Sequence, residues 1–102
     1  MSTTRTARDL NDADLEKVAG QFRLLGEPMR LKILQAICQK PLTVGEIVAA
    51  TGATQSNISR HLSLMAAAGV IKRQKNGLFV YYEMSNALTM KLCELVHKEM
   101  LQ

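Results

Sequence analysis

The side chains best suited to recognition chemistry lie close together, within a short stretch between positions 54 and 63. They are short polar groups with one cation and no carboxylate: Gln55, Ser56, Ser59, Arg60 and Ser63. Ile58, Leu62 and Met65 recur among them at steps of four and three, which predicts one helix with an apolar and a polar face. Solvent-facing helices usually mix Glu and Lys on the polar side. Short donors, an amide and a guanidinium instead suit the edges of DNA bases in the major groove.

Residues that can start and stop a helix lie at the two ends of this segment. Thr54 can act as N-cap, because its hydroxyl can accept a backbone N–H that has no partner in the helix. Gly69 can end the helix, since glycine readily adopts the left-handed conformation found there. A helix rich in Ser and Ala can also be an ordinary surface helix, so the flanking sequence has to decide between the two interpretations.

The distribution of charge favours nucleic acid. The net charge is +4, and no Asp or Glu lies between Glu46 and Glu83. That window holds four cations, which equal the net charge, and the remainder of the chain is balanced: Arg60, Lys72, Arg73 and Lys75. A carboxylate near phosphate would repel it, so an acid-free basic segment is typical of a DNA-binding surface. A chance cluster of charges is the alternative.

Length and composition limit the classes of protein. A chain of 102 residues with 47% apolar residues predicts one folded domain. The polar start of the chain and the lack of long apolar runs predict a cytoplasmic protein with no signal peptide and no membrane partner. The sequence has no phosphate-binding glycine loop, no His-Glu-x-x-His motif and no nucleophile elbow. We therefore expect neither an enzyme nor a bound cofactor.

Three helices are expected before the recognition helix. A polar arm over residues 1–14 precedes a single domain over residues 15–102, whose first helix ends near Gly26. Pro28 suits the first turn of a second helix, because its missing N–H is not needed there. That helix should stop before Pro41.

The third helix completes a helix-turn-helix. In the second helix, Arg30 and Lys32 are expected to point outward. Thr43 and Glu46 have capping-box spacing at the start of the third helix. Gly52 then allows a tight turn into the recognition helix, so two short helices pack as a DNA-reading pair.

A hairpin should follow the recognition helix. β-branched and aromatic residues flank Asn76-Gly77, which is the strongest short hairpin signal, because both residues tolerate positive φ. Lys72, Arg73 and Lys75 lie near the expected turn. A basic hairpin beside a reading helix is a wing that can contact phosphate or the minor groove.

The last helix, capped by Ser85 or Asn86, is expected to pair with the first in a dimer. Its apolar side holds Leu88, Leu92, Leu95 and Val96. The predicted fold class is therefore mainly α with a β-hairpin: a winged helix-turn-helix of about five helices and a two-stranded wing.

These motifs together resemble the ArsR/SmtB family of bacterial winged-helix repressors. The resemblance covers roughly residues 15–100 and is carried by five segments: Leu25-Gly26-Glu27-Pro28-Met29-Arg30-Leu31-Lys32-Ile33-Leu34, Leu42-Thr43-Val44-Gly45-Glu46-Ile47, Gln55-Ser56-Asn57-Ile58-Ser59-Arg60-His61-Leu62, Ala68-Gly69-Val70-Ile71 and Gly77-Leu78-Phe79-Val80-Tyr81-Tyr82. It implies a homodimer, built from the first and last helices, that binds an inverted repeat in double-stranded DNA and is released by a metal or redox signal.

The resemblance also implies roles for single residues. Gln55, Ser56, Ser59 and Arg60 would contact bases or nearby phosphates. Asn57 belongs to the same set of expected DNA-binding residues. Thr54, His61, Lys72, Arg73 and Lys75 would hold the DNA backbone. For His61, packing against the protein is the alternative to facing phosphate.

The metal sites of other family members are not expected here. Their Cys-x-Cys pair at the start of the third helix is replaced by Thr43 and Gly45. The four ligand positions on the last helix hold weak or unsuitable groups: Asn86, Leu88, Glu99 and Gln102.

Three interpretations of the cysteines stay open. Cys38 and Cys93 could form a thiol switch, since sulfur-sensing members have one cysteine in each of the same two helices. Cys93 and His97 lie four apart on one helix face, so a two-fold axis could assemble a Cys2His2 metal site. Both cysteines could instead be packed hydrophobic residues. The rival to DNA binding is a winged helix that binds an acidic protein.

Overall fold

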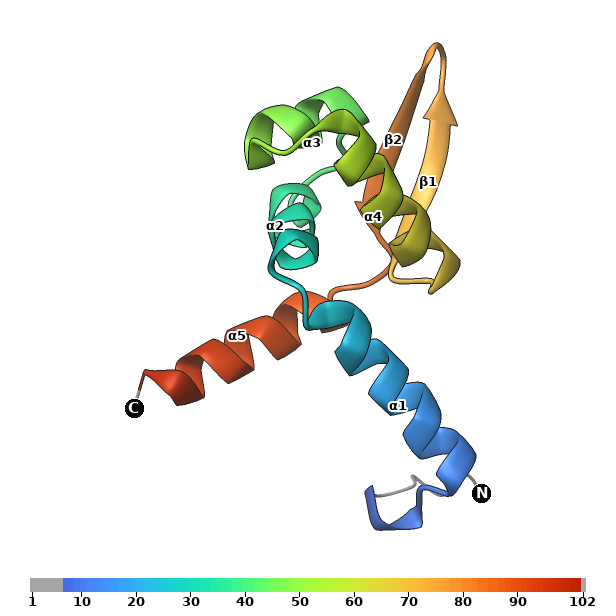
Figure 1. Cartoon of the computed structure of the whole chain (residues 1–102), viewed down its shortest axis with the longest axis vertical. Helices are drawn as coiled ribbons and strands as arrows, with labels where there is room; N and C mark the ends of the chain where they lie inside the picture. The colour runs from blue at the N-terminus through green and yellow to red at the C-terminus, as the bar shows by residue number, and fades with distance from the viewer. Residues whose placement is uncertain (1–6, 102) are drawn as a thin grey trace.

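Five helices and one hairpin make up the chain in the computed structural model, which describes residues 7–101 (Figure 1). The elements are a short 3-10 turn η1 (Ala7–Asp9), α1 (Asp12–Leu25), α2 (Pro28–Ile37), α3 (Val44–Thr51), α4 (Gln55–Ala67), β1 (Ile71–Asn76), β2 (Phe79–Met84) and α5 (Leu88–Met100). The predicted winged helix-turn-helix is confirmed. The predicted arm of residues 1–14 contains η1 and the first three residues of α1, while its residues 1–6, like Gln102, lie outside the described residues.

Polar caps fix the start of the helices that precede the recognition helix. Asn11 and Asp14 form a capping box on α1. On α3, Thr43 and Glu46 form the capping box that the sequence predicted. There the backbone N–H of Thr43 donates to Glu46, which lowers the pKa of that carboxyl. Pro28 begins α2 as expected, with Glu27 as N-cap.

A tight turn joins α3 to α4. Gly52 ends α3 in the left-handed conformation, with φ 76°, which glycine adopts without steric cost. Thr54 then caps α4 by accepting the N–H of Asn57. Two residues beyond the end of α4, Gly69 has φ 79°, and Gly69 and Val70 donate to the carbonyls of Ala66 and Met65. This pair of bonds is a Schellman motif.

The core lies between α2, α3, α4 and the base of the hairpin. Its fully buried side chains are Ile33, Leu34, Ile37, Ile47, Ile58, Leu62 and Met65. α4 supplies three of them from one face, as its spacing predicted. Packing against α2 and α3 therefore fixes which face of α4 remains exposed.

The hairpin is antiparallel, and its turn differs by one residue from the prediction. Asn76 pairs with Phe79, so the two central turn residues are Gly77 and Leu78. Only Gly77 has positive φ, at 65°, as in a type II′ turn. Leu42 pairs with Tyr82 through two backbone hydrogen bonds, which anchor the wing to the segment before α3.

α1 and α5 extend away from the winged-helix body in diverging directions (Figure 1). Both helices expose large apolar side chains, including Phe22 at 61% and Val96 at 57%. A cavity of about 340 Å³ lies between them, lined by Phe22, Leu25, Gly26, Leu31, Leu92, Cys93, Val96, His97 and Met100. Asn86 accepts the N–H of Leu88 from just outside α5, while the N-cap position itself is held by Ala87.

Within residues 7–101, none of the helices is long and apolar enough to span a membrane.

Candidate nucleic-acid interface

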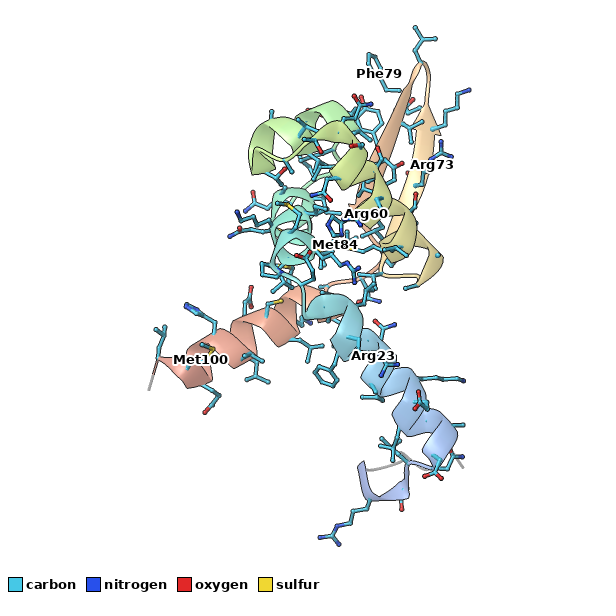
Figure 2. All side chains as sticks on the ribbon, in the orientation of Figure 1. Arg23, Arg60, Arg73, Phe79, Met84 and Met100 are labelled. Atoms are coloured by element: carbon cyan, nitrogen blue, oxygen red, sulfur yellow. The ribbon has the colours of Figure 1, made fainter. Side chains whose placement is uncertain are left out.

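One face of α4 presents the polar side chains that the sequence singled out. Gln55, Ser56 and Arg60 are exposed, while Asn57 and Ser59 are half-buried. The apolar side of the same helix is held in the core, so the polar face is directed outward. Figure 2 places Arg60 on α4 and Arg73 on β1, in the half of the molecule opposite α1 and α5. The fold thus brings the helix and the wing together on one side.

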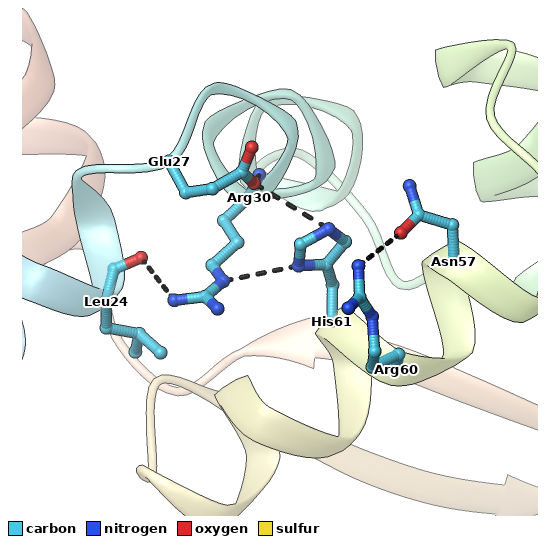
Figure 3. A network of polar contacts seen from close by, with 6 residues as sticks. All are labelled: Leu24, Glu27, Arg30, Asn57, Arg60 and His61. Carbon is cyan, nitrogen blue, oxygen red and sulfur yellow. Dashed lines mark hydrogen bonds and ion pairs between the residues drawn. The ribbon is translucent and has the colours of Figure 1, made fainter.

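Arg60 is held by its own helix. Its Nη2 donates to Oδ1 of Asn57 at 2.9 Å, one turn earlier (Figure 3). The guanidinium has five N–H donors in a planar fork, so one bond to Asn57 leaves the others for a base or a phosphate. Asn57 consequently orients Arg60 as well as facing the site itself.

Thr54 performs a structural task at the start of α4. Its hydroxyl accepts the N–H of Asn57 at 3.2 Å and lies 3.5 Å from the hydroxyl of Ser56. The first turn of α4 carries no acidic residue, and its N-terminus adds a partial positive charge to the exposed face. Such a helix start suits an anion such as phosphate.

The three wing cations divide between the two faces of the hairpin. Side chains alternate along a strand, so Arg73 and Lys75 share one face and Lys72 takes the other. Lys72 lies directly opposite Glu83 in the register. The carboxylate of Glu83 offsets the charge of Lys72, so Arg73 and Lys75 are the stronger candidates for phosphate.

His61 does not lie on the exposed face. The residue is only 6% exposed and packs on the inner side of α4. The prediction that it faces phosphate is wrong, and the packed alternative is confirmed. Its Nδ1 accepts a hydrogen bond from Nε of Arg30 at 3.2 Å, and its Nε2 lies 3.7 Å from Oε2 of Glu27 (Figure 3).

Arg30 was predicted to point outward, and this prediction is also wrong. Besides His61, its guanidinium reaches the end of α1, where Nη1 donates to the carbonyl of Leu24 at 3.1 Å. Glu27 accepts the backbone N–H of Arg30 at 3.0 Å. We call Leu24, Glu27, Arg30 and His61 the α1–α2–α4 joint, because these residues link the three helices.

The electrostatics of the joint keep His61 neutral. Burial lowers the pKa of His61, and Arg30 and Arg60 lower it further, while Glu27 acts in the opposite direction. For Glu27, desolvation raises the pKa, but the backbone N–H groups of Met29 and Arg30 and the nearby cations lower it overall. An arginine Nε always carries hydrogen, so Nδ1 of His61 must be the unprotonated acceptor.

The two cysteines are free thiols that lie near different ends of α2. Cys38 is exposed, follows the last residue of α2 and donates to the carbonyl of Gln35 at 3.0 Å. Cys93 is half-buried and shares its cavity with Leu31, near the start of α2. The helical rise from Leu31 to Cys38 is roughly 10 Å, whereas a disulfide needs Cα atoms within about 7 Å. The structure therefore does not bring the proposed switch together within one subunit.

Cys93 and His97 do line the same cavity between α1 and α5. The described part of the chain has no group of three His, Cys, Asp or Glu residues that could hold a metal. A metal site built on Cys93 and His97 would therefore need ligands from a second subunit, as the sequence argument already required.

Known proteins share this arrangement. A family model described as "Bacterial regulatory protein, arsR family" matches residues 27–73. The cadmium resistance transcriptional regulatory protein CadC of Listeria innocua is 33% identical over 92 residues, which cover 89% of this chain and 77% of CadC. The chain belongs to the arsR family. It is accordingly a transcription regulator and not an enzyme.

Two further relatives add detail to the assignment to the arsR family. The nodulation protein NolR of Rhizobium meliloti is 29% identical over 78% of this chain, which spans 65% of NolR, a little under two thirds. The homodimeric winged helix-turn-helix DNA-binding domain of Mb0332 from Mycobacterium bovis, solved in solution, has a TM-score of 0.75 at 26% identity. The structural match covers 95% of this chain and 87% of the Mb0332 domain.

Proposed function

We propose that this arsR-family protein is a homodimeric, cytoplasmic repressor that binds an inverted repeat in double-stranded DNA. The exposed, acid-free face of α4 carries the proposal, with Gln55, Ser56 and Arg60 exposed on it. Its donors suit base edges, and Arg73 and Lys75 on the wing can bind the adjacent phosphates. The homodimeric DNA-binding domain of Mb0332 supports the same arrangement by likeness.

The dimer interface is proposed on α1 and α5. Their exposed apolar side chains gather around the cavity at Phe22, Val96 and Met100. On α5, Lys91, Glu94 and Lys98 occupy the opposite side of the helix. A second copy that covers this apolar side would place two α4 helices on one DNA duplex, related by a two-fold axis.

The proposed release signal is oxidation of the thiols by peroxide or polysulfide. Cys38 is exposed, and the half-buried Cys93 lies at the proposed dimer interface, where a modified sulfur would disturb packing. Because the two thiols lie apart within one subunit, they would act separately or across the dimer. Metal binding at Cys93 and His97 is the second candidate, favoured by their shared cavity.

Two steps test the proposal. A 30-base-pair duplex is first recovered from a random library with the purified, reduced protein; we call it the selected duplex. We expect its affinity to fall after treatment with peroxide or polysulfide and to return with added thiol.

Cysteine variants then locate the release signal. If the double variant with Cys38→Ser and Cys93→Ser still responds to oxidant like the wild type, thiol release is excluded. Release by Zn(II) alone would instead assign the signal to Cys93 and His97. Failure to recover any duplex would contradict DNA binding itself.

A further inference from the structure

One partly buried polar cluster, the α1–α2–α4 joint, is not accounted for by DNA contact or by dimer packing. The Arg30 side chain donates to two acceptors on two other helices, the Leu24 carbonyl at the end of α1 and Nδ1 of His61 on α4. Among the described residues, no buried side-chain nitrogen or oxygen lacks a hydrogen-bond partner. Within the joint, Nδ1 of His61 and the Leu24 carbonyl each accept a hydrogen bond from Arg30, so loss of the Arg30 guanidinium would leave both acceptors without this donor.

We propose that Arg30 is a positioning residue for DNA binding, which fixes the reading helix α4 against the end of α1 through neutral His61. The inference rests on the proposed function, because it assigns α1 to the dimer and α4 to the DNA. Two α4 helices must match grooves about 34–36 Å apart. A joint that ties α4 to the dimer helix sets that distance.

Arginine is required for this task by its shape. Nε and Nη1 point in different directions from one rigid plane, so a single side chain reaches both acceptors. A lysine ammonium is a single point donor on a flexible stem, and it could satisfy one acceptor at a time. Arg30→Lys therefore keeps the charge and removes the link.

Protonation of His61 would break the same link. Nδ1 accepts from Arg30, so the proton of the neutral ring lies on Nε2, which faces Glu27. A second proton on Nδ1 would set two donors against each other. The charged groups around the ring are Glu27 and Arg30 from α2 and its N-cap, and Arg60 from α4, while α1 contributes the Leu24 carbonyl.

The sign of the change in DNA affinity with pH separates a positioning role of the joint from direct contact of His61 with phosphate. Burial lowers the pKa of His61, so the joint is intact at neutral pH and is lost as the pH falls below about 6.5 toward that lowered pKa. If the joint positions α4, DNA affinity falls on acidification. If His61 touched phosphate, its new charge would raise the affinity instead.

The first experiment measures affinity for the selected duplex between about pH 7 and pH 5 at constant ionic strength. The chain has two histidines, so His97→Gln leaves His61 as the only histidine. We expect the affinity to fall roughly threefold or more. An affinity that rises, or that stays constant, would overturn the proposal without needing any variant of the joint.

Matched variants provide the second experiment. Arg30→Lys should lower affinity for the selected duplex roughly tenfold at neutral pH, while the dimer dissociation constant stays unchanged. Arg23→Lys, on the exposed surface of α1, is the control and should bind like the wild type. His61→Asn keeps an acceptor near the Nδ1 position, so it should retain affinity and lose the acid response.

Wild-type affinity in Arg30→Lys, or an acid response that persists in His61→Asn with His97→Gln, would contradict the positioning role. These outcomes differ from failure of the proposed function, in which no duplex binds at neutral pH at all. They also differ from a merely structural role, which would lower thermal stability without giving a pH response that depends on His61.

Discussion

Replacing Val96 by glutamate is expected to make the protein monomeric and to lower its affinity for the selected duplex about 100-fold or more. Val96 is 57% exposed and lines the apolar cavity between α1 and α5. A carboxylate there would be buried without a partner in the dimer, which is costly. A monomer binds one half-site and loses the gain from two linked contacts. Sedimentation velocity and fluorescence anisotropy measure the two effects.

Lys98→Gln is the matched control. It changes the net charge by the same amount, and it lies on the opposite side of α5 from Val96. We expect it to remain dimeric and to bind within about twofold of the wild type. If Val96→Glu stays dimeric, or becomes monomeric with unchanged affinity for DNA, the dimer interface or its role in binding is wrong.

Arg60→Ala is expected to cost about 1–3 kcal/mol of binding free energy and to relax the preference for one base pair. Arg60 is the cation on the exposed face of α4, and Asn57 holds its guanidinium in place. Loss of this side chain removes a bidentate partner for guanine. Anisotropy with the selected duplex and with single-base variants measures both the affinity and the base preference.

Lys75→Ala separates base reading from phosphate binding. Lys75 is exposed on the wing, and its loss should weaken all duplexes alike and reduce the salt dependence by about one phosphate contact per subunit. If Arg60→Ala weakens every duplex equally, Arg60 contacts phosphate and another residue reads the base. Unchanged binding in both variants would show that DNA lies on a different surface.

Features set by neighbours in the chain could be predicted from the sequence. The capping box of Thr43 and Glu46 joins residues three apart, and the left-handed Gly52 ends its own helix. The two-faced character of α4 follows from the spacing of Ile58, Leu62 and Met65. Each depends on the geometry of one or two turns, so local reasoning was enough to place the reading helix and the turn before it.

The joint was missed because it depends on contacts between distant residues. Arg30 and His61 are 31 positions apart, and only packing of α2 on α4 brings them together. One local signal was available: His61 follows Ile58 by three and precedes Met65 by four, so it continues their buried stripe. On α2, Arg30 precedes Ile33 by three and Leu34 by four, so it lies next to the buried side of that helix. A polar residue in an apolar stripe predicts a buried partner.

The turn of the wing could be predicted from the sequence only in part. Asn76 and Gly77 correctly predicted a turn, but the register placed Gly77 and Leu78 at its centre. Pairing of Leu42 with Tyr82 anchors β2 from a distant segment. Register is decided jointly by the turn and by such long-range pairing. The pairing of Lys72 with Glu83 follows from that register, and it could not be derived from charge alone.

The measurement that tests the central claim most directly is the salt dependence of wild-type binding to the selected duplex. We expect an inverted repeat in the selected sequence and an affinity that falls steeply with salt, with a log–log slope of about −4 if Arg73 and Lys75 of each subunit contact phosphates. Binding that is indifferent to salt, or a random library from which no sequence is enriched, would contradict a DNA-reading dimer and would favour an acidic protein as the partner of this basic face.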